Sequence, residues 1–192
     1  MSFLPTFDER WAPVIGVRAA TFRAAIAQLE QQITAPCVIA ETGAMREEPN
    51  TINALSDGSS TMLWDEVANH HDATVRVFEL DSQRCLAVAK HVSARVTIHG
   101  GDAVRRLREL PIQSVDLLYL DSYDVEWHNP HPSALHHLME LASAMPAMKP
   151  SGLILIDDCG DSGGKGLYVA EYMSRANATL LARGYQQLWR LP

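Results

Sequence analysis

Apolar and polar positions alternate along the chain in two distinct patterns. Short runs of aliphatic, β-branched and aromatic residues predict buried strands. We expect these strands at residues 37–41, 74–81, 94–100, 114–121, 151–158 and 185–191. Between the runs, apolar residues recur three and four positions apart, which is typical of amphipathic helices. We expect these helices at about residues 16–32, 60–70, 82–91, 101–110, 132–145 and 164–182.

This succession of strands and helices predicts a doubly wound, Rossmann-like α/β fold with three layers. The strands are continuously apolar, which indicates that helices cover both faces of a mostly parallel sheet. We expect one domain over residues 1–192, with the N-terminal helical segment, about residues 1–34, packed on its core. A single strand after the last helix predicts a trimmed or unpaired sheet edge, which makes a homodimer reasonable. In the helix at 132–145, the predicted apolar stripe is Leu135, Leu138, Ala142 and Met145.

Composition narrows the classes of function. The 192 residues carry a net charge of −7 and no block of Lys or Arg, which argues against a nucleic-acid partner. The three cysteines are scattered and form no C-x-x-C pair. Neither a disulfide framework nor a zinc knuckle is therefore predicted, and a reduced, cytoplasmic compartment is favoured. No apolar run approaches the roughly 20 residues of a membrane span, so no membrane partner is expected.

Acidic side chains follow the predicted strands. Because the carboxyl ends of parallel strands meet at one edge of a sheet, we expect these acids to converge around one crevice. The six residues are Glu41, Asp81, Asp102, Asp121, Asp157 and Asp158. Their mutual repulsion is costly unless cations or hydrogen-bond donors lie among them. Each acid alone has a structural explanation as a helix cap or turn residue, but their repetition at strand ends favours a binding site.

These motifs, taken in order, resemble those of class I S-adenosylmethionine-dependent methyltransferases. The resemblance covers about residues 35–190 and is carried by VIAETG, VFELD, GDAVRRL, VDLLYLD and LILIDD. The sequence departs from most members after the first strand, where a long loop replaces a compact glycine-rich turn. It is similar in this respect to predicted methyltransferases that resemble metal-dependent sugar O-methyltransferases. The absence of a G-x-G-x-x-G fingerprint argues against a nicotinamide dehydrogenase.

The resemblance implies that S-adenosylmethionine is bound at the strand ends. Asp81 is expected to bind the ribose diol, and Asp102 the adenine. Glu41 and Asp121 suit the positive groups, and the helix start at 59–61 offers N–H groups and hydroxyls to the cofactor carboxylate. The loop from Thr42 to Asp57 is expected to fold over the cofactor. The expected cofactor-binding residues are Glu41, Thr42, Gly43, Arg46, Ser59, Ser60, Thr61, Asp81, Gly101, Asp102, Ala103, Asp121 and Tyr123.

Two further predictions concern a metal and a base. Metal-dependent O-methyltransferases of this fold carry acids at the positions of Asp121, Asp157 and Asp158, which implies a Mg²⁺ site with oxygen ligands. The alternative is a structural or cofactor-only role for these acids. The histidine-rich segment after residue 121 offers His136 and His128 as catalytic bases, with His131 as another candidate. The alternative here is that these are surface histidines and that His136–Glu140 is a solvated pair.

The resulting hypothesis is an enzyme that transfers a methyl group from S-adenosylmethionine to a hydroxyl of a small molecule. The expected acceptor is sugar-like or polyol-like. One alternative is a non-catalytic module of the same fold that binds a nucleoside or a protein partner. Another is a metal-dependent hydrolase built on the three aspartates, although the sequence lacks the additional His ligands expected of a dinuclear site.

Overall fold

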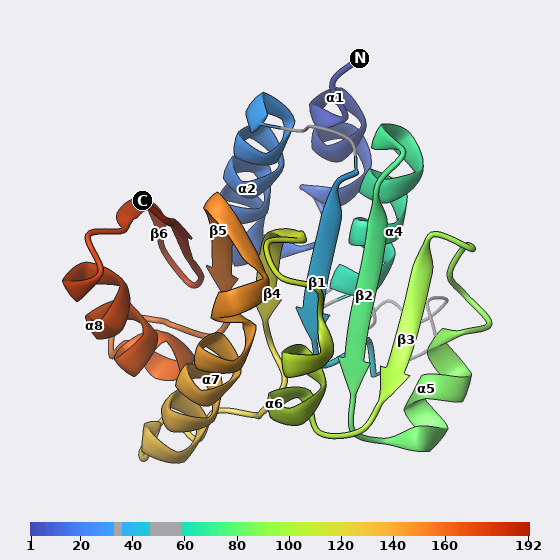
Figure 1. Cartoon of the computed structure of the whole chain (residues 1–192). Coiled ribbons are helices and arrows are strands. Elements are labelled where there is room, and N and C mark those ends of the chain that lie inside the picture. Colours follow the sequence, from blue (N-terminus) through green and yellow to red (C-terminus); the bar gives the residue numbers. More distant parts are fainter. Residues whose placement is uncertain (33–35, 47–58) are drawn as a thin grey trace.

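A seven-stranded sheet forms the centre of the molecule, shown in Figure 1. The computed structural model describes residues 1–32, 36–46 and 59–192. The strands lie in the order β3-β2-β1-β4-β5-β7-β6. The five parallel strands are β1 (Val38–Thr42), β2 (Thr74–Glu79), β3 (Val96–Gly100), β4 (Val115–Leu120) and β5 (Met148–Ile156). The predicted mostly parallel, doubly wound α/β fold is therefore confirmed.

Helices cover both faces of this sheet. The helices between the strands are α4 (Ser60–His71), α5 (Ser82–Val88), α6 (Ala103–Arg106) with its 3-10 turn η3 (Leu107–Glu109), α7 (His131–Ala144) with η4 (Met145–Ala147), and α8 (Leu167–Arg175) preceded by η5 (Gly164–Gly166). Side chains of β5 alternate between two cores. Leu153 and Leu155 pack with α4, and Ile154 and Ile156 pack with α6, α7 and α8. This two-sided burial explains why the strand is apolar throughout.

The N-terminal segment packs on the same face of the sheet as α4. It consists of α1 (Leu4–Thr6), the π-helical turn η1 (Phe7–Trp11), the 3-10 turn η2 (Gly16–Arg18) and α2 (Ala19–Gln32). Four of its apolar side chains recur every fourth residue and are buried in the core beside α4. They are Phe3, Phe7, Trp11 and Ile15. This packing carries Arg18, at the end of η2, to the carboxyl edge of the sheet.

The C-terminal end of the chain differs from the prediction. A helix to residue 182 and a single closing strand were expected, but α8 ends at Arg175 and two antiparallel strands follow, β6 (Thr179–Arg183) and β7 (Gln187–Arg190). Asn177 adopts a left-handed conformation with φ of 58°, which ends the helical geometry before Leu180 and Leu181. Because β7 pairs with β5 and β6, the hairpin completes the sheet, and the argument for a partner at a trimmed edge no longer holds.

The buried face of α7 also differs from the predicted stripe. Leu135 and Ala142 are exposed, whereas His137 and Glu140 are fully buried beside the apolar Leu141. The interpretation of His136–Glu140 as a solvated surface pair was therefore wrong for Glu140. No helix in the described ranges has both the length and the apolar character needed to cross a membrane.

Candidate functional site

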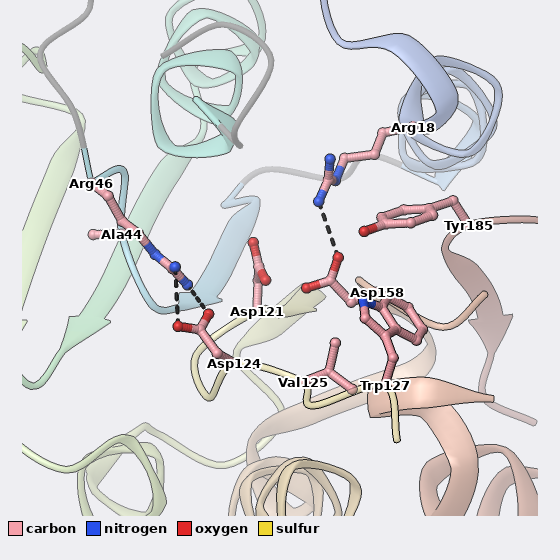
Figure 2. A pocket seen from close by; sticks show the side chains of 9 residues that line it. All are labelled: Arg18, Ala44, Arg46, Asp121, Asp124, Val125, Trp127, Asp158 and Tyr185. Atoms are coloured by element: carbon pink, nitrogen blue, oxygen red, sulfur yellow. Dashed lines mark hydrogen bonds and ion pairs between the residues drawn. The ribbon is translucent and has the colours of Figure 1, made fainter. Parts of the chain in front are cut away.

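Two neighbouring cavities lie at the carboxyl edge of the sheet. The first, called the β2 cavity, has a volume of about 110 Å³ and is lined by Gly43, Phe78, Glu79, Leu80, Arg84, Asp102, Ala103, Ser122, Tyr123 and His136. The second, called the β5 cavity, has a volume of about 230 Å³ and is lined by Arg18, Ala44, Arg46, Asp121, Asp124, Val125, Trp127, Asp158 and Tyr185 (Figure 2). Consecutive residues after β1 and β4 line one cavity or the other, so these two loops separate them.

Gly43 allows the two separating loops to approach closely. Its φ is 81°, and a Cβ at this position would lie 2.5 Å from the carbonyl oxygen of Asp121. The Asp121 N–H donates to the carbonyl oxygen of Thr42 at 3.2 Å, which joins the ends of β1 and β4. The close approach of the neighbouring backbone therefore requires a glycine after the first strand, because any larger residue would clash with it.

At the end of β2, two acids have different environments. Asp81, the predicted ribose ligand, is exposed and is the N-cap of α5, where its Oδ1 accepts from the N–H groups of Gln83 and Arg84. It does not line the β2 cavity. Glu79 is buried, lines that cavity, and its Oε2 lies 3.3 Å from Arg84 Nη1. The geometry therefore favours Glu79 over Asp81 as the acid available to a ligand.

Asp102 combines a capping role with a place in the β2 cavity. Its Oδ1 accepts from the N–H of Val104 at 3.0 Å at the start of α6, and its side chain and Ala103 line the cavity. Gly101, which was predicted beside them, is not among the lining residues. The carboxylate at the end of β3 is thus placed where the sequence predicted it.

Glu41 is buried at the end of β1, beside the start of α4. Ser60 Oγ donates to its Oε1 at 2.5 Å, whereas Oε2 is buried without a hydrogen-bond partner among the described residues. Burial raises the pKa of Glu41 to about 8. The helix does begin beside Ser59, as predicted, and Thr61 Oγ1 accepts from the N–H of Met45 at 3.4 Å. Residues 47–58 of the expected covering loop lie outside the described part of the chain.

The buried side chain of Glu140, on α7, joins the end of β1 to the loop after β4. It accepts from Thr42 Oγ1 at 3.0 Å and from Ser122 Oγ at 2.7 Å, and its Oε1 lies 3.3 Å from His136 Nε2. Burial acts to raise the pKa of Glu140, but the hydrogen bond from His136 and the neighbouring His137 hold it below its ordinary value. Sequence reasoning missed this buried acid because His136 and Glu140 also fit an exposed i,i+4 pair.

The predicted histidine bases occupy different places. His136 lines the β2 cavity beside Tyr123, with ring centroids 5.4 Å apart, and the hydrogen bond to Glu140 raises its pKa. His128 is exposed near Glu126, and His131 Nδ1 lies 2.8 Å from the hydroxyl of Tyr168. Neither of these two lines the β2 or the β5 cavity.

The predicted metal ligands do come together. Asp121, Asp157 and Asp158, here called the acidic triad, each offer an oxygen atom that lies within 4.8 Å of the others. Two cations of the chain contact them. Arg18 Nε lies 2.9 Å from both carboxylate oxygens of Asp157, and Lys165 Nζ lies 2.5 Å from Asp121 Oδ1. The sequence reasoning noted that such acids need cations among them, but it identified neither of these two residues.

Aromatic residues and a second ion pair complete the β5 cavity. Arg18 Cζ lies over the Tyr185 ring, 4.7 Å from the ring centroid, and the Trp127 ring lies next to Tyr185, with ring centroids 6.2 Å apart (Figure 2). Arg46, predicted to bind a carboxylate, pairs with Asp124 across the cavity. The lining is therefore mostly polar and charged, which suits a ligand with hydroxyl groups better than an apolar one.

Comparisons with known proteins show the fold. No protein-family model and no curated protein matches the sequence. The MycE methyltransferase from the mycinamycin biosynthetic pathway, solved in complex with Mg, SAH and mycinamycin VI, matches with a TM-score of 0.64 and 14% identity. The match covers 98% of this chain and 54% of MycE, so the chain spans about half the length of that protein.

Two shorter proteins match as well. A methyltransferase from Geobacter sulfurreducens has a TM-score of 0.57 and 13% identity, over 98% of this chain and 85% of its own. The O-methyltransferase NovP has a TM-score of 0.52 and 15% identity, over 98% of this chain and 78% of its own. At these identities the likeness concerns the fold, which is that of the class I S-adenosylmethionine-dependent methyltransferases.

Proposed function

We propose that this chain, which has the class I methyltransferase fold, transfers a methyl group from S-adenosylmethionine to a hydroxyl of a small molecule. The observation that carries the proposal is the pair of adjacent cavities at the carboxyl edge of the sheet. The β2 cavity holds the acids that suit a nucleoside, and the β5 cavity holds a polar, charged lining. A donor in one and an acceptor in the other would meet at the loops after β1 and β4, which favours direct transfer between them.

The residues of the β2 cavity fit the cofactor. Glu79 offers a carboxylate at the end of β2 for the ribose diol, and Asp102 with Ala103 offers the adenine site at the end of β3. Glu41 lines neither cavity, but its buried Oε2 has no hydrogen-bond partner among the described residues. This atom suits the ammonium of the methionyl part, since a buried polar atom without a partner is costly in the absence of a ligand. We propose these acids as the cofactor-binding residues, with Glu79 in the role first given to Asp81.

The β5 cavity is proposed to bind the acceptor. S-adenosylmethionine supplies a methyl group that is already activated by the sulfonium. The protein then has to position the acceptor oxygen and remove its proton. Asp121 and Asp124 are the carboxylates of the loop after β4 that line this cavity, and we propose that one of them accepts the proton. His136 faces the β2 cavity and is proposed to orient Glu140 and Tyr123 there.

Magnesium assistance was a further prediction for the acidic triad. Three carboxylates are ligands of the kind that Mg²⁺ prefers, and MycE was solved with Mg. In this chain, however, the side chains of Arg18 and Lys165 already contact all three carboxylates. The acidic triad together with Arg18 and Lys165 therefore does not fit an added Mg²⁺ ion, and we propose no catalytic step that depends on a metal ion.

Calorimetric titration with S-adenosylmethionine and S-adenosylhomocysteine tests the proposal. We expect binding by the natural chain and a loss of at least tenfold in affinity in Glu79→Gln, because a ribose hydrogen-bond acceptor is lost. Asp81→Asn is the matched control, two residues away and outside the cavity, and it should bind as the natural chain does. Failure of the natural chain to bind either nucleoside would reject the proposal.

Methyl transfer is then measured with methyl-labelled S-adenosylmethionine and a panel of sugars and polyols. Transfer to a hydroxyl supports the enzymatic function. Tight nucleoside binding without transfer to any acceptor would instead support the non-catalytic module of the same fold.

A further inference from the structure

Lys165 lies between two members of the acidic triad, Asp121 and Asp158. Its Nζ is 2.5 Å from Asp121 Oδ1 and 2.9 Å from Asp158 Oδ2, and its side chain is 0% exposed. An ammonium between two carboxylates, at hydrogen-bond distance from both, occupies the kind of position that a bound cation would take. Such a lysine is unusual, because fully buried lysines occur almost only where they are paired.

The backbone around Lys165 fixes it in this place. Its N–H donates to the carbonyl oxygen of Asp158 at 3.1 Å. On either side, a Cβ at Gly164 would lie 1.9 Å from the Asp158 carbonyl oxygen, and one at Gly166 would lie 2.6 Å from Cys159 Sγ. The two glycines therefore let η5 pack directly against the end of β5. This packing holds the backbone of Lys165 next to Asp158, its own ion-pair partner.

Arg18 neutralises the remaining member of the triad. Its Nε lies 2.9 Å from both oxygens of Asp157, and its Nη2 lies 3.1 Å from Asp158 Oδ1. Asp158 therefore contacts both cations, and Asp121 and Asp157 contact one each. Two positive charges face three negative charges, and a divalent ion would have to enter beside both cations in a desolvated site.

We propose that Lys165 occupies the cation position of the acidic triad, so that the triad is an internal ion-pair cluster that excludes divalent metal ions. The inference deepens the proposed function and rests on it for one consequence, namely that methyl transfer by this chain proceeds without a divalent ion. Lys165 is then a positioning residue. It does not line the β5 cavity itself, but it holds Asp121 and Asp158, which do.

Titration with Mn²⁺, followed by the loss of the free-ion electron paramagnetic resonance signal, tests this inference. The natural chain should leave the signal unchanged at equimolar and tenfold excess metal. Lys165→Ala and Lys165→Met remove the ammonium and leave three carboxylates with one cation. Each should bind one Mn²⁺ at least tenfold more tightly than the natural chain, and Mg²⁺ should compete.

Lys149→Met is the matched control. Lys149 Nζ lies 2.8 Å from Asp116, so this change also removes a lysine from a carboxylate, but away from the triad. It should gain no Mn²⁺ site. Stoichiometric binding by the natural chain that is lost in Asp157→Asn would overturn the inference, as would folded Lys165 variants that gain no metal.

Two features keep the test decisive. The titration of the natural chain needs no variant, so a Lys165 variant that fails to fold does not remove the test. A rise in the melting temperature of a Lys165 variant on addition of Mn²⁺, absent in the natural chain, is an independent supporting result. The readout is metal binding, so it stands even if calorimetry finds no nucleoside binding and the proposed function fails.

Discussion

The two cavities contain similar numbers of acids but hold them in different ways. On the β2 side, Asp102 accepts from the N–H of Val104, and Glu79 accepts from the N–H of Asp81 and contacts the partly exposed Arg84. On the β5 side, the acidic triad is held by the charged groups of Lys165 and Arg18. Acids held by backbone N–H groups or by one partly exposed cation are less fully compensated than acids held by the buried Lys165 and the largely buried Arg18, so they stay more available to a cationic or polyhydroxyl ligand. The residue type alone therefore does not reveal whether an acid is available.

The largest expected difference between the two sides concerns stability. Lys165→Met removes a buried cation and leaves Asp121 without it, so we expect the free energy of unfolding to fall by about 3–5 kcal/mol. Arg84→Met removes the partly exposed cation that contacts the buried Glu79, which keeps the hydrogen bond from the Asp81 N–H, and should cost less, about 1–2 kcal/mol. Urea denaturation of both variants measures the difference. Equal losses would contradict the contrast between the two sides.

A smaller effect is expected at the connection between the cavities. Glu140→Ala removes the acceptor shared by Thr42 and Ser122, and we expect a loss of about 1–3 kcal/mol in the free energy of unfolding. Because Thr42 ends β1 and Ser122 lines the β2 cavity, nucleoside affinity should also fall. Glu126→Ala, an exposed acid in the loop before the same helix, is the control and should change neither quantity.

The smallest effect is expected from pH. Glu140 raises the pKa of His136 above its ordinary value of 6.5, and His136 and His137 help to lower that of Glu140 below 4.5. The His136–Glu140 pair thus contributes fully between these two values. Its contribution declines as pH rises through the raised pKa of His136, and also as pH falls through the lowered pKa of Glu140.

We expect this contribution to remain below about 1 kcal/mol, since His136 is partly exposed. The measurement is the difference in unfolding free energy between the natural chain and His136→Asn from pH 4 to 9. A difference that does not change with pH would mean that the pair contributes through packing alone.

Much of the fold follows from the sequence, because each buried strand must be apolar on both faces and each strand end carries a polar signal. VDLLYLD and LILIDD lie in neighbouring strands, and the prediction that Asp121 and Asp157–Asp158 converge relied only on parallel pairing. The hairpin at the C-terminus was missed because Leu180 and Leu181 continue a helical spacing past Asn177. A short turn over residues 176–178, with left-handed backbone at Asn177, separates α8 from β6.

The residues that decide the chemistry of the site were harder to predict. Arg18 reaches Asp157 from the other end of the chain, and a single arginine carries no local pattern that reveals such a contact. The sequence held a weak signal for Lys165, since this lysine lies between two glycines a few residues after Asp157 and Asp158, which follow β5 directly. On the β2 side, Glu79 and Asp81 are two positions apart, and the choice between them depends on where the strand ends and the cap of α5 begins.

The contact between Arg18 and Asp157 also bears on how the chain folds during synthesis. Arg18 is separated from Asp157 by 139 positions, so a ribosome releases the guanidinium long before the carboxylate that it binds. Thr21 of α2 contacts a residue even farther along the chain, since its Oγ1 donates to Gln186 Oε1 at 2.5 Å. Contacts between such remote residues close late because of the loop entropy they require. We therefore expect the contact between Arg18 and Asp157 to form later in folding than the contact between Lys165 and Asp158, which are close in sequence.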